Sequence, residues 1–257
     1  MKGFKINNMA GAAYYTSPIM DKEKAVHHFF SSRIGGRSTG PYESLNLGVY
    51  TEDAQENTGE NMSRIFTAAG MNHNNAVYLK QVHGDTLYIV TNDNLNQTRG
   101  LEGDGLITRE IGIPIGIFTA DCVPILLFDR NRKIAAALHG GWKGTALGIV
   151  KKAVELMCLQ MGASPKDIIA AIGPCIGKCC FEVGREVAEK FESSIEREKK
   201  LYVDLALENA SQLKSCGVIE ENISISGMCT FCSQKMLFSY RRDRGLTGRM
   251  GSFIEII

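Results

Sequence analysis

Short apolar runs alternate with polar, glycine-containing segments along most of the chain. Four runs are rich in β-branched residues and resemble strands buried on both faces: residues 113–118, 123–128, 134–138 and 168–172. Further strand candidates are residues 25–30, 77–81, 86–90 and 223–226. Between the second and third of these, His83, Gly84 and Asp85 predict a turn.

Helical periodicity appears between these runs. The helix candidates are residues 58–69, 145–161, 184–191 and 206–216, with Gly162 as the stop of the second. Strands and helices alternate, but some strands follow one another directly. The pattern therefore predicts an α/β (α+β) sandwich of mixed β-sheets flanked by helices. Since no linker-like segment interrupts it, we expect a single domain over residues 1–257.

Composition narrows the function classes. Apolar residues make up 44% and charged residues 22%, as in ordinary globular proteins, and the net charge of +1 argues against coating nucleic acid or anionic membranes. The most apolar stretch, residues 111–128, is broken by Asp121 and Pro124, and the first residues lack a signal-peptide core. The 8 cysteines are therefore expected to be reduced thiols in a cytoplasmic protein without nucleic-acid or membrane partners.

Three metal-ligand side chains lie beside the ends of predicted strands: His83, Cys122 and His139. Side chains at the ends of neighbouring strands can converge, and His₂Cys with one open position is a known catalytic zinc set. A single histidine at a strand end is more often a satisfied polar residue, and cysteine is often simply buried. A second functional interpretation makes Cys122 a nucleophile with His139 as its base. Spacing alone does not separate these interpretations.

Anion-binding candidates lie in two places. Gly140, Gly141 and Gly144 surround Lys143 in a loop that opens a predicted helix, which suits phosphate, although a plain strand-to-helix turn fits equally. Near the C-terminus, Arg241 and Arg242 form an arginine pair that suits bidentate phosphate binding, although such charge runs are usually solvated.

Two other polar loop residues, Asn46 and Asp104, are candidates for contacts to substrate or are ordinary turn residues. Cys229 and Cys232 have zinc-knuckle spacing, and Cys175, Cys179 and Cys180 are potential partners. A structural four-cysteine site usually shows two CxxC-like pairs, so we do not expect structural zinc there.

In order along the chain, ten blocks together resemble one broadly distributed family, described first as multicopper, laccase-like polyphenol oxidases and later as purine nucleoside phosphorylases. These blocks are residues 33–38, 44–48, 81–84, 103–108, 119–124, 139–144, 173–183, 229–230, 238–242 and 248–249. They span nearly the whole chain from about residue 29.

The resemblance implies a metal site on His83, Cys122 and His139, holding zinc or alternatively copper. It implies phosphorolysis of adenosine, inosine and guanosine to a free base and ribose 1-phosphate, with adenosine deamination and methylthioadenosine phosphorolysis at the same site. Asn46, Asp104, Lys143, Arg241 and Arg242 are then the substrate and phosphate candidates. The implied fold is similar to that of bacterial-toxin cysteine hydrolases, and the implied assembly is a monomer or small homo-oligomer.

One departure affects phosphate binding: Lys143 stands where the family usually has arginine, and a lysine offers only a point charge. Three alternatives remain. The first is a cysteine hydrolase or amidase acting on cell-wall precursors or peptides through Cys122 and His139. The second is a phenol oxidase, disfavoured because a copper relay needs more ligands than five histidines supply. The third is a partner-binding protein that uses the basic patch at residues 241–249.

Overall fold

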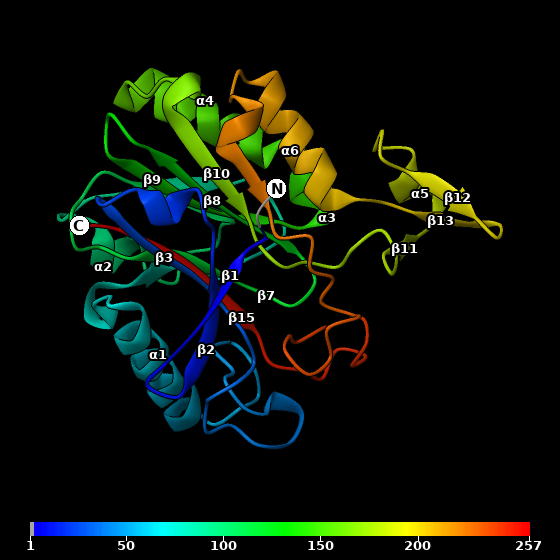
Figure 1. The fold of residues 1–257 in the computed structure, drawn as a ribbon, viewed down its shortest axis with the longest axis horizontal. Helices are drawn as coiled ribbons and strands as arrows, with labels where there is room; N and C mark the ends of the chain where they lie inside the picture. Colours follow the sequence, from blue (N-terminus) through cyan, green and yellow to red (C-terminus); the bar gives the residue numbers. More distant parts are fainter. Residues whose placement is uncertain (1–2) are drawn as a thin grey trace.

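The computed structural model describes residues 3–257 and arranges them in four layers (Figure 1). Two six-stranded sheets pack face to face. Helix α1 (Gln55–Ala69) covers the outer face of the first sheet. Helices α4 (Ile149–Met161) and α6 (Leu205–Ser215) cover the outer face of the second. This is the mixed α/β sandwich that the sequence pattern predicts.

The first sheet has mostly antiparallel neighbours. Its strand order is β1 (Lys5–Met9), β2 (Ala12–Thr16), β3 (Val26–Ser31), β15 (Met250–Ile256), β7 (Ile115–Thr119) and β4 (Val77–Tyr78). The C-terminal strand β15 lies in the middle of the sheet, with Phe253 opposite Phe29 on one side and Gly116 on the other. Its one parallel pair within residues 3–257 is β4 with β7.

The second sheet carries the most apolar strands. Its order is β14 (Ile223–Ile225), β10 (Ile168–Ile172), β8 (Val123–Asp129), β9 (Ile134–Gly140), β6 (Gly105–Thr108) and β5 (Leu87–Val90). Every residue of β8 and β9 is buried, because helices cover one face and the first sheet covers the other. The pairs β10–β14 and β5–β6 are parallel and the rest antiparallel, so this sheet is also mixed.

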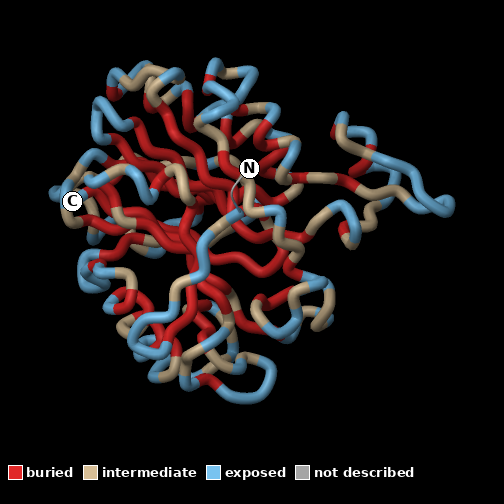
Figure 2. The backbone as a smooth tube through the Cα atoms, in the orientation of Figure 1, coloured by how far each residue is buried: buried red, intermediate tan, exposed pale blue. Residues whose placement is uncertain are grey.

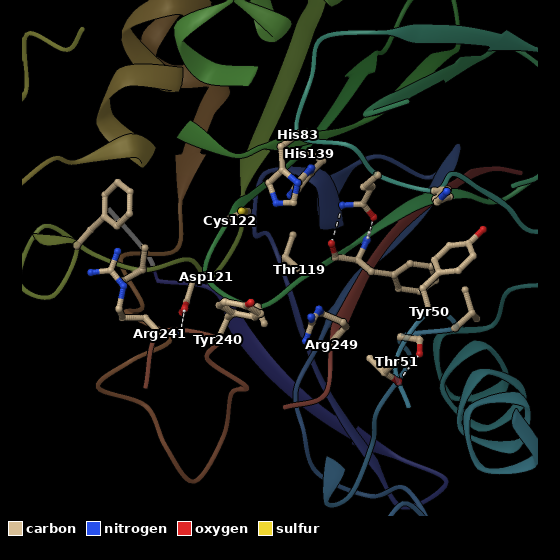
Figure 3. A pocket seen from close by; sticks show the side chains of 18 residues that line it. Tyr50, Thr51, His83, Thr119, Asp121, Cys122, His139, Tyr240, Arg241 and Arg249 are labelled. Carbon is tan, nitrogen blue, oxygen red and sulfur yellow. Dashed lines mark hydrogen bonds between the residues drawn. The ribbon is translucent and has the colours of Figure 1, made fainter. Parts of the chain in front are cut away.

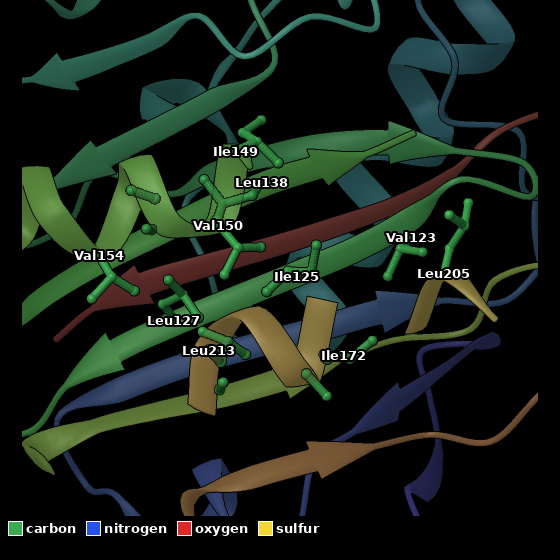
Figure 4. Close-up of a cluster of buried hydrophobic side chains, with 14 of the residues drawn as sticks. Val123, Ile125, Leu127, Leu138, Ile149, Val150, Val154, Ile172, Leu205 and Leu213 are labelled. Carbon is green, nitrogen blue, oxygen red and sulfur yellow. The ribbon is translucent and has the colours of Figure 1, made fainter. Parts of the chain in front are cut away.

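Besides the cluster between α1 and the first sheet, two apolar clusters hold the layers together. One fills the space between the sheets, with Phe30 and Ile254 of the first against Leu126 and Phe128 of the second. The other packs the helices onto the second sheet, where Val154 and Leu213 lie near Leu127 (Figure 4). Burying a side chain of this size contributes about 1.5–3 kcal/mol, so these clusters stabilise the scaffold beneath the loops.

A small third sheet projects from this sandwich (Figure 1). It consists of β11 (Glu182–Val183), β13 (Lys200–Tyr202) and β12 (Ile195–Arg197), in that order, with α5 (Arg185–Ala188) beside it. Its strands are largely exposed or half-buried, in contrast to the core (Figure 2). We call residues 182–203 the arm.

The remaining helices are short. They are α2 (Leu95–Thr98), α3 (Trp142–Ala146) and the 3-10 turns Met20–Lys22, Gly40–Tyr42, His73–Asn75, Pro165–Asp167 and Glu220–Asn222. Within the described residues, no helix is long and apolar enough to cross a membrane.

Three local expectations are corrected by the structure. The helix predicted over residues 145–161 is divided into α3 and α4, because Gly148 adopts the left-handed region with φ +77°. Gly162 ends α4, as predicted. The helix predicted over residues 184–191 is only the short α5. The turn predicted at residues 83–85 does not pair the strands on either side of it, since β4 and β5 belong to different sheets.

Candidate active site and metal centre

His83, Cys122 and His139 converge at one edge of the sandwich (Figure 3). Two of them lie where the chain crosses between sheets: His83 between β4 and β5, and Cys122 between β7 and β8. His139 is part of β9 itself. Their ligand atoms all lie within 4.8 Å of one another, and the two imidazole centroids are 4.8 Å apart. The strand ends thus bring together the three residues that the sequence singles out.

The buried Asp104 carboxylate holds both histidines in place. Its Oδ1 is 2.8 Å from His139 Nδ1 and accepts the backbone N–H of His83 at 2.9 Å, while its Oδ2 accepts the N–H of Gly84 at 2.6 Å. Burial opposes ionisation of Asp104, but the contacts with His139 and the two N–H groups hold its pKa below the ordinary value. With Nδ1 occupied, His139 presents Nε2 toward the other ligands, the carboxylate–histidine arrangement common behind bound metals.

Cys122 and His139 reinforce each other's charged forms. Burial opposes ionisation of the Cys122 thiol, yet His139 and His83 lower its pKa to about 6. Burial likewise opposes protonation of His139, while the Cys122 thiolate and Asp104 raise its pKa to about 9. A thiolate is the form that binds a metal or attacks an electrophile, so the site favours either role.

Asp121 holds the crossing segment in an unusual backbone conformation. Its φ is +95°, a region that residues with a Cβ rarely adopt. Its carboxylate accepts hydrogen bonds from Thr230 Oγ1 at 2.5 Å and from the backbone N–H of Arg241 at 2.7 Å. These contacts offset the strain and fix the direction of the neighbouring Cys122.

The donor set fits a catalytic metal centre. Two imidazoles and one thiolate provide three protein ligands, and the same residues line a cavity on their open side. Gly141 packs directly against them: a Cβ built there would lie 3.1 Å from His83 Cδ2 and 3.4 Å from Cys122 Sγ. A glycine at this position therefore leaves room for the ligands to converge.

The cavity beside the triad has a volume of about 580 Å³, in the range of small-molecule sites. Aromatic rings form much of its wall, and Arg241 and Arg249 are the arginines on it (Figure 3). Its aromatic residues are Tyr50, Phe118, Phe181 and Tyr240. The hydroxyl of Thr119 is buried in this wall and has no hydrogen-bond partner within residues 3–257. These groups suit a ligand with a flat apolar part and an anionic part.

The two arginines on the cavity wall are held by different neighbours. The Arg249 guanidinium lies over the Tyr240 ring, 5.5 Å from its centroid, and donates to the carbonyl of Thr247 at 2.7 Å. The Arg241 guanidinium lies 5.5 Å from the centroid of Phe181 and donates to the carbonyl of Glu182 at 2.9 Å. Each keeps further N–H groups available for a ligand, because an arginine has five donors.

Four sequence-predicted substrate residues do not line this cavity. Asn46 is fully buried, where its amide contacts Thr51 and Asp53 and its Oδ1 accepts the N–H of Arg249. Asp104 is fully buried behind the histidines. Both therefore support the site from outside the cavity, and their contact to ribose or base stays a prediction.

Lys143 and Arg242 also lie away from the cavity wall, and their phosphate contacts stay predictions. Lys143 is exposed, with its ammonium 5.6 Å from the centroid of its neighbour Trp142. Arg242 uses its guanidinium within the protein, on the Asp243 carboxylate and the carbonyls of Thr230 and Leu237. Of the predicted phosphate residues, only Arg241 lies on the cavity wall.

Sequence reasoning missed Thr119 and Arg249 as individual cavity residues. Both lie in the blocks that carry the family resemblance, Thr119 beside the Asp121–Cys122 crossing and Arg249 after Gly248. Arg249 also belongs to the basic patch at residues 241–249, whereas a buried threonine has no distinctive pattern in a sequence.

Comparison with known proteins shows the family to which the chain belongs. The family model "Multi-copper polyphenol oxidoreductase laccase" matches residues 27–257. A protein of Deinococcus radiodurans named purine nucleoside phosphorylase is 39% identical over 239 residues, 90% of each chain. Purine nucleoside phosphorylase YfiH of Escherichia coli is 36% identical over 248 residues, 93% of this chain and 98% of its own.

Solved structures extend the match to the whole fold. The crystal structure of YlmD from Geobacillus stearothermophilus superposes with a TM-score of 0.90 at 31% identity, covering 100% of this chain and 99% of the other. The Bacillus licheniformis protein YfiH gives a TM-score of 0.90 at 30% identity, covering 98% and 99%. The chain belongs to the multi-copper polyphenol oxidoreductase laccase family, the group that the ordered blocks of its sequence resemble.

Proposed function

We propose that the protein is a metal-dependent purine nucleoside phosphorylase, which converts adenosine, inosine or guanosine and phosphate into a free base and ribose 1-phosphate. The observation that carries the proposal is the His₂Cys cluster, which opens into a cavity with aromatic walls and two arginines. The names of the relatives support the same reaction.

The metal ligands would be His83, Cys122 and His139, and we propose zinc, with copper as the alternative. A metal bound there would supply Lewis-acid chemistry, which can stabilise developing negative charge on a substrate or lower the pKa of a water molecule. Asp104 would keep both histidines oriented throughout.

In phosphorolysis, the C1′–N9 bond breaks and its electron pair leaves with the purine, while a phosphate oxygen bonds to C1′. Arg241 and Arg249 would hold the phosphate, since guanidinium groups pair with its oxygens through two parallel hydrogen bonds. Phe118, Phe181 or Tyr240 would stack on the purine ring, and the unpartnered hydroxyl of Thr119 would bond to a polar atom of the substrate. Excluding water from this site strengthens each of these contacts.

We also propose that adenosine deamination and methylthioadenosine phosphorolysis occur at this site. Both substrates carry the purine and ribose that the cavity would bind, so no second cavity is required. The eight free cysteines agree with a reducing compartment such as the cytoplasm.

One specific observation supports a second candidate, a cysteine hydrolase. His139 lies between the Cys122 thiol, whose pKa is lowered to about 6, and the Asp104 carboxylate at 2.8 Å. This order of nucleophile, base and orienting carboxylate is that of a hydrolytic triad. Such an enzyme would act on an amide without metal or phosphate.

The Cys122→Ala variant tests the proposal. It should lose phosphorolysis and deamination together, because both would depend on one metal site, while the control Cys158→Ala, on α4, keeps both. Loss of only one activity would contradict a shared site. Amide hydrolysis by chelator-treated wild-type protein would favour the second candidate instead.

A further inference from the structure

Four other cysteines form a second cluster, outside the cavity. Cys179 and Cys180 lie in the loop after β10, and Cys229 and Cys232 lie in the loop after β14. Because β10 and β14 are parallel neighbours, these loops leave the sheet at the same edge. Backbone pairing continues beyond the two strands as an isolated parallel β-bridge between residues Cys175 and Cys229. The two loops therefore run side by side.

The distances suit a single metal ion. The four Sγ atoms lie within 4.8 Å of one another, with Cys232 at 3.4 Å from Cys180 and 3.8 Å from Cys179. Four thiolates held tetrahedrally at about 2.3 Å from zinc are separated by about 3.8 Å. The cluster is therefore close to the dimensions of a four-thiolate zinc site.

Groups around the cluster also suit thiolate ligands. The backbone N–H of Gly177 donates to Cys229 Sγ at 3.3 Å, a contact that stabilises negative charge on sulfur. Gly177 itself is confined between the two loops, since a Cβ there would lie 3.3 Å from both Cys179 Sγ and Cys229 Cβ. Arg197 of the arm donates to the Cys179 carbonyl at 3.1 Å and adds positive charge beside the thiols.

We propose that Cys179, Cys180, Cys229 and Cys232 bind a zinc ion in a closed structural site. Soft thiolates select zinc over hard cations, and four of them leave no open position for catalysis. The sequence alone does not predict zinc here, because the second CxxC pair is missing. The parallel strands supply the missing half by placing the adjacent pair Cys179 and Cys180 opposite the CxxC pair.

This ion would brace one wall of the cavity. Phe181, which lines the cavity, directly follows Cys180, and the arm begins at the next residue. Thr230, between Cys229 and Cys232, donates to the Asp121 carboxylate beside Cys122. Zinc would thus fix both segments while remaining distinct from the His₂Cys centre.

Zinc counting in purified full-length protein tests the proposal. Protein saturated with zinc under reducing conditions and then desalted should hold two ions per chain. The double variant His83→Ala with Cys122→Ala should keep one ion, which isolates the cysteine cluster from the proposed catalytic metal. Cys229→Ser with Cys232→Ser should also hold one, and the matched control Cys158→Ser with Cys216→Ser should hold two.

X-ray absorption at the zinc edge identifies the ligands of the ion that remains in the His83→Ala, Cys122→Ala protein. Four sulfur neighbours at about 2.3 Å are expected. A folded double variant without zinc, a coordination shell containing nitrogen, or a Cys180–Cys232 disulfide found by mass spectrometry of the wild type would overturn the proposal. If the His83→Ala, Cys122→Ala protein does not fold, the Cys229→Ser, Cys232→Ser protein decides: one zinc fewer than the wild type supports the proposal, and an unchanged count overturns it. A failure of phosphorolysis alone would leave these metal results unchanged.

Discussion

Replacing Asp104 with asparagine should weaken metal binding far more than the small chemical change suggests. The carboxylate uses one oxygen for His139 Nδ1 and the His83 N–H, and the other for the Gly84 N–H. An amide has only one acceptor oxygen, so its NH₂ group must face one of these donors in a fully buried position. Either the His139 ring or the loop that carries His83 loses its support.

Loss of such a supporting partner typically lowers metal affinity about 10–100-fold, or about 1.4–2.7 kcal/mol. The mispaired buried donor should also lower the free energy of unfolding by about 1–3 kcal/mol. Zinc affinity is measured by competition with a chelator, and stability by urea unfolding of the metal-free protein, which separates the two effects.

Asp129→Asn provides a matched control. Asp129 is also fully buried and accepts three backbone N–H groups, from Asn131, Arg132 and Ser164, at the opposite end of β8 from Cys122. Its loss should lower stability while zinc affinity stays within about twofold of the wild type. If a folded Asp104→Asn protein also keeps the zinc affinity of the wild type, Asp104 does not support the histidine ligands as argued.

Three further changes probe the site. Arg249→Met should raise KM for phosphate at least about tenfold, since a hydrogen bond to a charged group contributes about 1.5–3 kcal/mol. The control Arg242→Met should lower Tm and leave that KM unchanged. The reverse pattern would contradict the assignment of Arg249 to phosphate. The Cys122 thiolate forms as pH rises through its pKa, so alkylation of the metal-free protein by iodoacetamide should reach half its maximal rate near pH 6. A midpoint near pH 9 would argue against the contacts with His139. Gly141→Ala should reduce zinc affinity, because the new Cβ would lie 3.1 Å from His83. Urea unfolding of the metal-free variant should change little. Full zinc affinity would show instead that the ligands have room to adjust.

The strands and the triad were accessible from the sequence for a physical reason. Strands buried on both faces, such as β8 and β9, are continuous apolar runs, and polar residues such as Cys122 and His139 interrupt them only where the chain leaves the sheet. The pattern therefore marked both the scaffold and the edge at which the ligands meet.

The central strand β15 was not predicted, because it contains Gly251, Ser252 and Glu255 among its apolar residues. Its burial depends on the strands around it, which local periodicity does not report. The comparison with bacterial-toxin cysteine hydrolases, the single-domain organisation and the oligomeric state stay predictions.

The sequence does not show which candidate binding residues line the cavity, because tertiary contacts decide their placement. Arg241 and Arg242 are adjacent in the sequence, yet Arg241 lines the cavity while Arg242 hydrogen-bonds to Asp243 and to backbone carbonyls. The four clustered cysteines likewise depend on the pairing of β10 with β14, which joins segments about fifty residues apart. Neither distinction is present in the local sequence.

The most direct test of the proposed function follows hypoxanthine and ribose 1-phosphate in protein of known zinc content supplied with inosine, with and without phosphate. Both products should appear in equal amounts only when phosphate is present, and chelation should abolish them. Hypoxanthine released with free ribose in the absence of phosphate, or no release despite a full metal complement, would contradict the proposed function.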